Sequence, residues 1–205
     1  QHVIRESRHP TSYLANRGDY SLDYHWHEAR GVFGRGDRTH HAMAGVVDGT
    51  SNTVLCAEAK IGVRGSKKVT EAICLAQVGP GNIFTGNVET GDWQIGHRWL
   101  DAICPYTYFF TMLAPNGPSC SRRGEDWAIV TASSYHPGGC NVVFVDGSTH
   151  FITDSIDAGD PTMTVQQMPE WQGGGRPQDY MGASPYGVWG ALGTVQGGEP
   201  TPTIK

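Results

Sequence analysis

The chain has 205 residues, including 28 glycines and 12 prolines, and only 17% of its residues are charged. This length fits one domain of about 100–200 residues, and the composition favours short strands and loops over long helices. A net charge of −5 without a basic stripe argues against nucleic acid and anionic membrane surfaces as partners.

Residues 1–45 carry turn-forming residues without a regular period. Within a single domain over 1–205, we therefore expect a loop-rich N-terminal part over 1–45, a core over 46–200 and a frayed tail over 201–205. No apolar stretch approaches the roughly 18 residues that span a membrane, so we expect no membrane contact by this fragment.

The tripeptide Arg-Gly-Asp occurs twice, at 17–19 and 35–37. Some cell-adhesion ligands carry this tripeptide. Because Gly-Asp is ordinary turn chemistry, we interpret both copies as polar turns.

Asp23, His25 and His27 alternate along the sequence, so on a strand they would share one face. Two imidazoles and a carboxylate suit a divalent transition metal such as zinc, with His40 or His41 as a further nitrogen ligand. Without a His-Glu-x-x-His spacing, we favour a surface cluster of histidines over the centre of a metal-dependent hydrolase.

Asp48 and Gly49 open a turn, and residues 54–59 continue as an extended, mostly apolar run. Glu58 lies inside that run, where a buried carboxylate needs a partner. Arg98 is the candidate partner by charge alone. A raised pKa of Glu58 would indicate catalysis, whereas an ion pair or hydrogen bonds to the backbone would indicate a structural role, which we favour.

The clearest strand–turn–strand signal lies in two runs, 141–145 and 148–152, which are rich in β-branched and aromatic residues. Asp146-Gly147 between them is typical of a two-residue hairpin loop. Such a loop places Val143 opposite His150. Since both resulting faces are largely apolar, we expect this hairpin at the centre of a sheet, covered on both sides.

Ser134, His136 and Asp146 have the residue types of a catalytic triad. We favour a structural interpretation for all three. Pro137-Gly138-Gly139 forms a turn that His136 can order by hydrogen bonding to the backbone, and an Asp-Gly pair at a hairpin tip is explained by backbone geometry.

Asp154, Asp157 and Asp160 follow one another at intervals of three in a glycine-containing stretch. Carboxylates and loop carbonyls are the ligands of calcium, so calcium is the metal that this stretch would hold in preference to zinc. The spacing is not that of an EF-hand, and we favour solvated surface acids.

Four stretches, in order along the chain, carry a resemblance to a known family. They are Asp48-Gly49-Thr50-Ser51-Asn52-Thr53 with Glu58 beyond it, Pro-Asn-Gly-Pro-Ser-Cys at 115–120, His136 followed after nine residues by Asp146-Gly147, and 184–194 with Gly197-Gly198-Glu199. The pattern resembles the prepilin-type processing-associated H-x9-DG family, bacterial pseudopilin-like proteins of unknown function. The resemblance implies a structural motif made of His136, Gly138, Gly139, Asp146, Gly147, Asp48, Gly49, Asn52 and Glu58.

Members of that family usually begin with a prepilin leader and one long hydrophobic helix. This chain instead starts with a polar run, so we expect that helix to have been removed by processing or left out. The resemblance and the strand signals together predict an α+β fold that is mostly antiparallel β-sheet, a pseudopilin-like head domain with long Gly/Pro-rich loops. The resemblance also implies export to the cell surface or beyond, where disulfides are permitted.

Five cysteines are present, at positions 56, 74, 104, 120 and 140. Cys56 and Cys140 lie in apolar runs and are expected to be buried free thiols. Cys104 and Cys120 flank a strand-like run in turn-rich sequence, so theirs is the disulfide we prefer, with Cys74 as the rival partner.

The resemblance favours an extracellular structural or assembly head domain of a pilin- or pseudopilin-like filament or secretion-associated apparatus. Its partners would be other pilin-like subunits or further copies of itself. The alternative is a cell-surface module that binds a ligand or glycan, because exposed aromatic rings can stack on sugar faces. The candidate rings are Trp26, Trp93, Trp171, Tyr180 and Tyr186. The metal-dependent hydrolase is the second alternative; we expect no catalytic residue, and no cofactor other than calcium.

Overall fold

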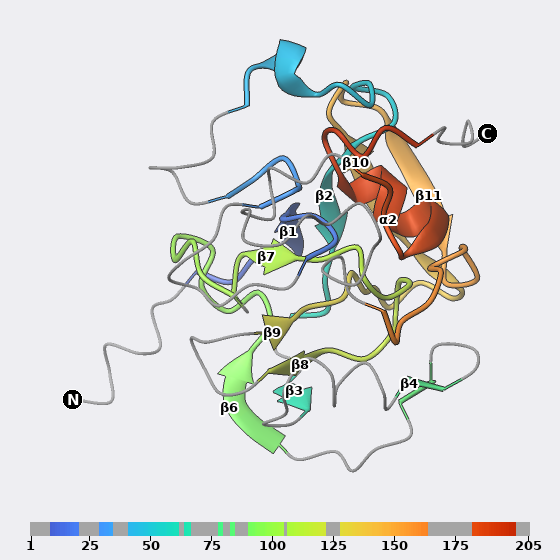
Figure 1. Ribbon diagram of the computed structural model, residues 1–205. Helices are drawn as coiled ribbons and strands as arrows, with labels where there is room; N and C mark the ends of the chain where they lie inside the picture. The colour runs from blue at the N-terminus through green and yellow to red at the C-terminus, as the bar shows by residue number, and fades with distance from the viewer. Residues whose placement is uncertain are drawn as a thin grey trace, which may run out of the picture.

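The computed structural model describes residues 9–20, 29–34, 41–61, 64–66, 78–79, 83–84, 90–104, 106–121, 128–163 and 182–199. Its largest element is a five-stranded sheet in the order β11-β10-β2-β1-β7. The strands are β1 (Tyr13–Asn16), β2 (Val54–Glu58), β7 (Tyr108–Phe109), β10 (Gly139–Phe144) and β11 (Thr149–Thr153). Figure 1 shows how this sheet brings distant parts of the chain side by side.

Short ribbons and helical segments complete the described part of the fold. The two-stranded ribbons are β3 (Arg64–Ser66) with β6 (Thr90–Gln94), β4 (Val78–Gly79) with β5 (Ile83–Phe84), and β8 (Cys120–Ser121) with β9 (Ala128–Ile129). The helical segments are the 3-10 turn η2 (Met43–Gly45) and the α-helix α2 (Gly187–Gly193). In Figure 1, α2 lies beside β10 and β11, and the ribbons of β3, β6, β8 and β9 lie together below the sheet.

The sheet is mixed, so the prediction of an α+β fold with a mostly antiparallel, pseudopilin-like sheet is wrong. β1 pairs antiparallel with β2 but parallel with β7. Among the described residues α2 is the one α-helix, it has seven residues, and no helix there is long and apolar enough to cross a membrane. The sequence concealed this topology because β1 has only four residues and ends in a buried polar side chain, Asn16.

The predicted hairpin is confirmed as the antiparallel pair β10–β11, but its loop is one residue longer than expected. The Phe144 N–H donates to the Ser148 carbonyl and the Gly147 N–H donates to the Phe144 carbonyl, both at 2.9 Å. Residues 145–147 therefore form a three-residue loop. Gly147 closes it with φ 87°, a left-handed conformation that suits glycine.

The longer loop shifts the hairpin register by one residue. The predicted central position is also wrong, because the strand order places β11 at one edge of the sheet. Val143 lies opposite Thr149 and not His150, and His150 lies opposite Val142. A one-residue shift exchanges the two faces of a strand. Val142 is fully buried while Phe151 is 45% exposed, so the hairpin is covered on one face only.

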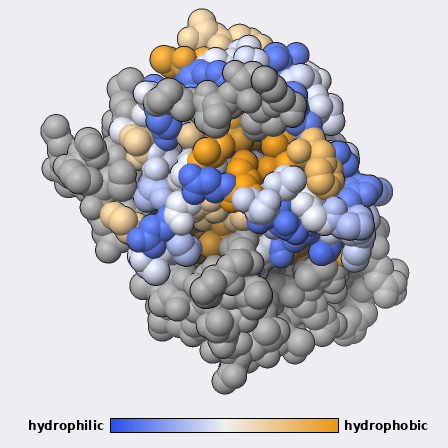
Figure 2. Space-filling view, turned by 90° about the vertical axis from the view of Figure 1, so that its right-hand side faces the viewer, coloured by the Kyte–Doolittle hydropathy of each residue, from blue (hydrophilic) through white to orange (hydrophobic). Residues whose placement is uncertain are grey.

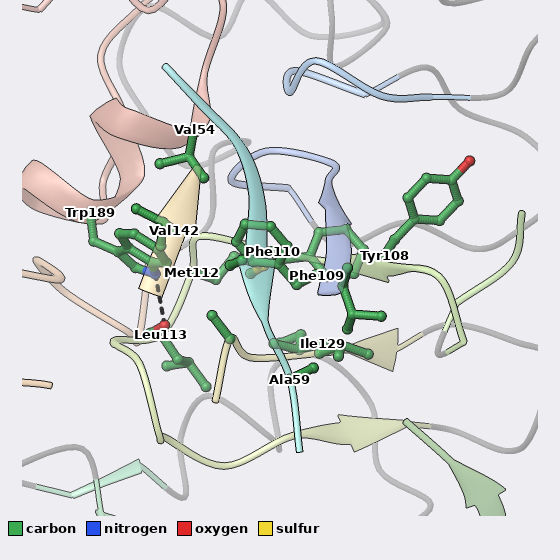
Figure 3. Close-up of a cluster of buried hydrophobic side chains, with 14 of the residues drawn as sticks. Val54, Ala59, Tyr108, Phe109, Phe110, Met112, Leu113, Ile129, Val142 and Trp189 are labelled. Atoms are coloured by element: carbon green, nitrogen blue, oxygen red, sulfur yellow. Dashed lines mark hydrogen bonds between the residues drawn. The ribbon is translucent and has the colours of Figure 1, made fainter. Parts of the chain in front are cut away.

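The covered face of the sheet packs on a core of aromatic and branched side chains, drawn in Figure 3. Trp189 of α2 is fully buried, and its ring stacks on Phe109 of β7 with 6.2 Å between ring centroids. The Trp189 indole N–H donates to the Leu113 carbonyl at 2.9 Å (Figure 3). A buried indole with its polar atom satisfied anchors the short helix α2 against the sheet.

Candidate functional site

The carboxylate of Asp48 ties the first sequence box to the C-terminal box. Its Oδ2 accepts hydrogen bonds from the Thr194 hydroxyl (3.1 Å) and the Gly197 N–H (2.7 Å), and its Oδ1 accepts one from the Gly198 N–H (3.0 Å). The two boxes are 149 residues apart at the Gly197 contact. Asp48 therefore closes the fold by binding distant main-chain donors.

The other residues of the first box shape its turn. The Asn52 side-chain amide donates to the Asp48 carbonyl at 3.2 Å, and the Thr53 hydroxyl donates to the Gly49 carbonyl at 3.1 Å. The same Thr53 hydroxyl lies 3.3 Å from the Thr194 carbonyl. The side chains of Asn52 and Thr53 thus bond to the backbone, as such residues commonly do in turns.

The second box, residues 115–120, holds the entrance to β10. Asn116 has φ 62°; its side-chain Oδ1 accepts the Ser134 N–H at 3.0 Å and its Nδ2 donates to the Gly139 carbonyl at 3.2 Å. The Ser134 hydroxyl donates to the same carbonyl at 2.6 Å and accepts the His136 N–H at 3.0 Å. Asn116 and Ser134 together fix the turn that contains Gly138.

Ser134, His136 and Asp146 do not form a catalytic triad. Asp146 lies beyond the opposite end of β10, where it accepts the Ser148 hydroxyl at 2.6 Å and the Ser148 N–H at 2.9 Å. These hydrogen bonds from Ser148 lower the pKa of Asp146 below its usual value. Asp146 thus organises the hairpin loop, while Ser134 and His136 organise the turn at the other end.

Glu58 has partners that differ from the predicted one. Its Oε2 accepts hydrogen bonds from the Asn141 backbone N–H (2.7 Å) and the Asn141 side-chain amide (3.2 Å), and its Oε1 lies 3.4 Å from the His136 Nε2. Arg98 instead pairs with Asp101 at 3.2 Å, so the predicted Glu58–Arg98 pair is wrong. Charge alone had suggested Arg98, whereas the sheet brings a neutral backbone donor to Glu58.

Glu58 lies within an exposed polar and aromatic surface, which we call the Glu58 face. The Glu58 face consists of Tyr13, Glu58, Lys60, Tyr135, His136 and Asn141. Tyr135 is 81% exposed, and the Lys60 ammonium lies 5.4 Å from the centroid of its ring. Burial, and next the neighbouring Glu58 carboxylate, raise the pKa of Tyr13. The Glu58 face therefore presents a carboxylate, an imidazole and two phenol rings on one side of the sheet.

The three acidic residues proposed as calcium ligands do not converge. The Asp157 carboxylate accepts the Gly159 N–H at 2.9 Å, and the Asp160 carboxylate accepts the Thr162 hydroxyl at 2.6 Å. Hydrogen bonds from Thr162 lower the pKa of Asp160. In the part of the chain that the structure describes, Asp154 joins no trio of His, Cys, Asp or Glu side chains placed to hold a metal ion.

Most of the histidine cluster of the N-terminal part lies outside the residues that the structure describes. Asp23, His25, His27 and His40 lie outside the described residues. His41 is described, and it is exposed beside η2. The zinc-dependent alternative therefore gains no support from His41.

The candidate ligand-stacking rings do not gather into a described site. Trp26, Trp171 and Tyr180 lie outside the described residues, and for Trp93 the backbone in β6 is described but the side chain is not. Tyr186 is fully buried, and its hydroxyl donates to a backbone carbonyl at 2.8 Å. A buried ring offers no face to a ligand, so Tyr186 does not fit the stacking role.

The cysteines differ from the preferred pairing. Cys120 is disulfide-bonded, whereas Cys104 is a free, fully buried thiol, so the Cys104–Cys120 disulfide is wrong. The rival partner Cys74 lies outside the described residues. Cys56 and Cys140 are free thiols as predicted, but Cys56 is only half-buried. Burial, followed by the nearby Glu58 carboxylate, raises the pKa of Cys140 to about 12.

The first Arg-Gly-Asp tripeptide is buried and is not the polar surface turn that we expected. Arg17 is 2% exposed and Asp19 is fully buried. The Arg30 guanidinium donates to the Asp19 Oδ2 at 3.1 Å, and the Arg17 guanidinium lies 4.9 Å from the Tyr108 ring centroid. Burial outweighs the attraction of Arg30 and raises the pKa of Asp19. This tripeptide is inaccessible to a receptor, and the second copy at 35–37 lies outside the described residues.

Sequence analysis missed Asn16, which joins three elements of the fold. Its Nδ2 donates to the Val54 carbonyl at 2.7 Å and the Gly193 carbonyl at 2.9 Å, and its Oδ1 accepts the Gly18 N–H at 2.8 Å. Asn16 is fully buried. The one feature of the sequence that could have indicated this role is the position of Asn16 directly after two apolar residues and directly before Arg17-Gly18.

These features define a small β-domain in which polar side chains of separate sequence boxes fix distant segments to one mixed sheet. The chain belongs to the family described as a protein of unknown function, DUF1559, whose model matches residues 2–159. That match includes the first three boxes, and the C-terminal box at 184–199 lies beyond it. No curated protein and no solved structure matches the chain.

Proposed function

We propose that this chain is an extracellular structural subunit of a filament or secretion-associated assembly of pilin-like proteins, and that it belongs to the H-x9-DG group. The observation that carries the proposal is the set of hydrogen bonds that the Asp48 carboxylate accepts. All three donors on its carboxylate come from the C-terminal box. A carboxylate that accepts three hydrogen bonds from the protein's own hydroxyl and backbone N–H groups holds the fold together and is not free to act on a substrate.

Glu58 supports the same conclusion. A catalytic acid needs access to substrate and a pKa matched to its task. Glu58 is instead 16% exposed and bonded to the backbone N–H of Asn141, which fastens β2 to β10. The resemblance of the boxes to the H-x9-DG pattern then points to an assembly of pilin-like subunits.

Export is supported by the disulfide at Cys120. Structural disulfides persist in oxidising compartments and are rare in the reducing cytosol. In a 205-residue chain with free thiols at Cys56, Cys104 and Cys140, a bond at Cys120 fits a protein that folds outside the cytosol.

The proposal is tested in the cells that make the protein. Surface fractionation, with labelling of thiols before and after reduction, should find the protein outside the cytosol with Cys120 oxidised and with the free thiols of Cys56, Cys104 and Cys140. Brief amine cross-linking of intact cells should join it to other subunits. A cytosolic protein with a reduced Cys120 and no cross-linked partner would exclude an extracellular assembly role.

A second candidate, a surface module for glycans, is favoured by the Glu58 face. Tyr135 and Tyr13 are 81% and 46% exposed, and polar groups of Glu58 and His136 lie beside them. Rings beside hydrogen-bonding groups are the usual means of holding a sugar. Binding to a panel of immobilised glycans that Tyr135→Ala abolishes, and that Leu100→Ala at another exposed position leaves intact, would favour this candidate; no binding to any glycan would remove it.

A further inference from the structure

β11 forms one edge of the five-stranded sheet, and no described strand pairs with its outer side. The hydrogen bond from the Phe144 N–H to the Ser148 carbonyl identifies Phe144 and Ser148 as a hydrogen-bonded pair of the hairpin. Because hydrogen-bonded and non-bonded pairs alternate in an antiparallel ladder, His150 and Ile152 direct their backbone groups toward β10. Thr149, Phe151 and Thr153 direct theirs away from the sheet.

Among the residues that the structure describes, almost none is a hydrogen-bond partner of the outward backbone groups of β11. The hydrogen bonds of the described residues include one from the Ile156 N–H to the Thr153 carbonyl (3.1 Å), and that oxygen keeps a second lone pair. No hydrogen bond of the described residues uses the outward N–H and C=O groups of Phe151 and Thr149. An unpaired strand edge is a template for pairing with another strand.

β11 also lacks the features that usually protect such an edge. Natural edge strands carry lysine, proline, charged residues or bulges that prevent pairing. The sequence of β11 is Thr-His-Phe-Ile-Thr, which contains none of these. Phe151 is 45% exposed, and Thr149 and Thr153 beside it are exposed as well. Figure 2, which views the molecule from the β11 side of Figure 1, shows apolar residues near the centre of the described surface, with hydrophilic residues to their left and right.

We propose that β11 pairs antiparallel with β11 of a second copy of this chain, with Phe151 on the two-fold axis. This proposal rests on the proposed assembly function and identifies one of its contacts. The outward residues of β11 are symmetric about Phe151, since Thr149 and Thr153 stand two positions to either side. In this register each Phe151 faces the other Phe151, and Thr149 faces the second copy's Thr153. Aromatic pairs and threonine pairs are favourable across strands.

This self-complementary pattern is the reason to favour a second copy over an unrelated strand. A two-fold interface uses the same patch on both molecules, so a strand that matches itself when reversed is suited to it. The two five-stranded sheets would join into one continuous sheet. One pair of short strands buries little surface, so we expect a weak dimer that forms at the high local concentration of an assembly.

Salt should strengthen this dimer. Asp146 and Asp154 flank β11, and in the proposed register Asp154 lies near Asp146 of the second copy at each end of the paired strands. Each copy also carries a net charge of −5. Like charges at these distances repel, and added salt screens them.

Symmetric cross-linking tests the register directly. Backbones of a hydrogen-bonded antiparallel pair lie about 5.5 Å apart between Cα atoms, a distance that a disulfide spans. Phe151→Cys should therefore form a disulfide-linked dimer on mild oxidation. Thr149→Cys is the matched control, because its two copies would lie about 13 Å apart at 3.3 Å per residue. Equal cross-linking of both variants, or none by Phe151→Cys, would overturn the proposal.

Sedimentation measures the dimer without a cross-link. The unmodified protein should dimerise between about 10 µM and about 1 mM, where small interfaces dissociate. Phe151→Lys should abolish the dimer, since a charged edge residue prevents pairing. Leu100→Lys changes a residue that is 70% exposed elsewhere and should leave it intact. If Phe151→Lys stays dimeric, the β11 contact is wrong. If Phe151→Lys abolishes the dimer but still cross-links to other subunits in cells, the assembly function does not depend on it. A protein that stays monomeric in solution while cross-linking to other subunits in cells would refute the β11 contact and leave the proposed function standing.

Discussion

Asn16→Leu replaces the Asn16 side chain by one with the same number of non-hydrogen atoms and no polar group. It removes the hydrogen bonds that join β1 to β2 and to the end of α2. The change leaves the carbonyls of Val54 and Gly193 and the N–H of Gly18 without their partner in a fully buried site. Each buried polar group left unpaired costs about 1–3 kcal/mol. Allowing for partial relaxation, we expect the free energy of unfolding to fall by roughly 3–6 kcal/mol. At about 2–4 °C per kcal/mol for a chain of this size, Tm falls by roughly 6–24 °C.

Asn16→Asp keeps the shape of the side chain and the acceptor for Gly18, but it turns a second oxygen toward the carbonyls of Val54 and Gly193. Burial and the two carbonyl dipoles raise the pKa of the introduced carboxyl above its unfolded value of about 3.9. Below that value the carboxyl is protonated in both states, and it can donate to one carbonyl. As pH rises toward the folded pKa, the unfolded state releases its proton first, so the variant loses stability.

Urea unfolding of the parent and both Asn16 variants at about pH 4 and about pH 7 tests this reasoning. The deficit of Asn16→Asp relative to the parent should be smaller at the lower pH, while the deficit of Asn16→Leu should be nearly the same at both. If Asn16→Leu stays within about 0.5 kcal/mol of the parent, the range expected for a tolerated surface change, the three hydrogen bonds do not support the fold as argued.

Gly147→Ala places a side chain at φ 87° with no atom within 4 Å of it, so we expect a loss of about 1–2 kcal/mol. Gly139→Ala would put its Cβ 2.2 Å from a backbone carbonyl of β11 and should cost more than about 3 kcal/mol, because the backbone must move; thermal melts that rank the two the other way would contradict this. Cys140, with a pKa raised to about 12, should resist iodoacetamide at neutral pH in the folded protein and react after unfolding, as mass spectrometry would detect. Ser148→Ala removes the hydroxyl that lowers the pKa of Asp146, so the pKa of that carboxyl, measured by NMR titration, should rise toward its ordinary value. The stability that the loop gains from the Asp146 carboxylate is present above the unfolded pKa and is lost as pH falls through the folded pKa, and this contribution should shrink in the variant. An unchanged titration would assign the shift to another cause.

The hairpin shows where prediction from sequence succeeds and where it ends. Local composition located both strands, because β-branched runs around an Asp-Gly pair form hairpins in most settings. The length of the loop was set elsewhere. The Val145 N–H donates to the Thr53 carbonyl at 2.9 Å and the Asp146 N–H donates to the Thr50 carbonyl at 3.0 Å. These contacts from the first box draw Val145 out of the ladder, and no local pattern could reveal them.

The same distinction applies to Glu58. A carboxylate within an apolar strand predicts that some partner exists, and that expectation followed from desolvation alone. The identity of the partner depended on which strand lies beside β2. Once β10 is placed there, the backbone N–H of Asn141 reaches Glu58 at 2.7 Å, and the distant Arg98 is not required.

Asp48, Glu58, Asn16 and Asn116 act in one common way, since each bonds to main-chain groups of a segment far away in the sequence. Such bonds do not depend on the side chain of the partner residue. The sequence therefore indicates the polar residue on one side of each contact but not its backbone partner on the other side. In a chain with few regular elements, many backbone groups lack a ladder or helix partner, yet buried ones must be paired. The polar residues of the boxes meet that requirement, which explains how loop-rich sequence can close around the five-stranded sheet.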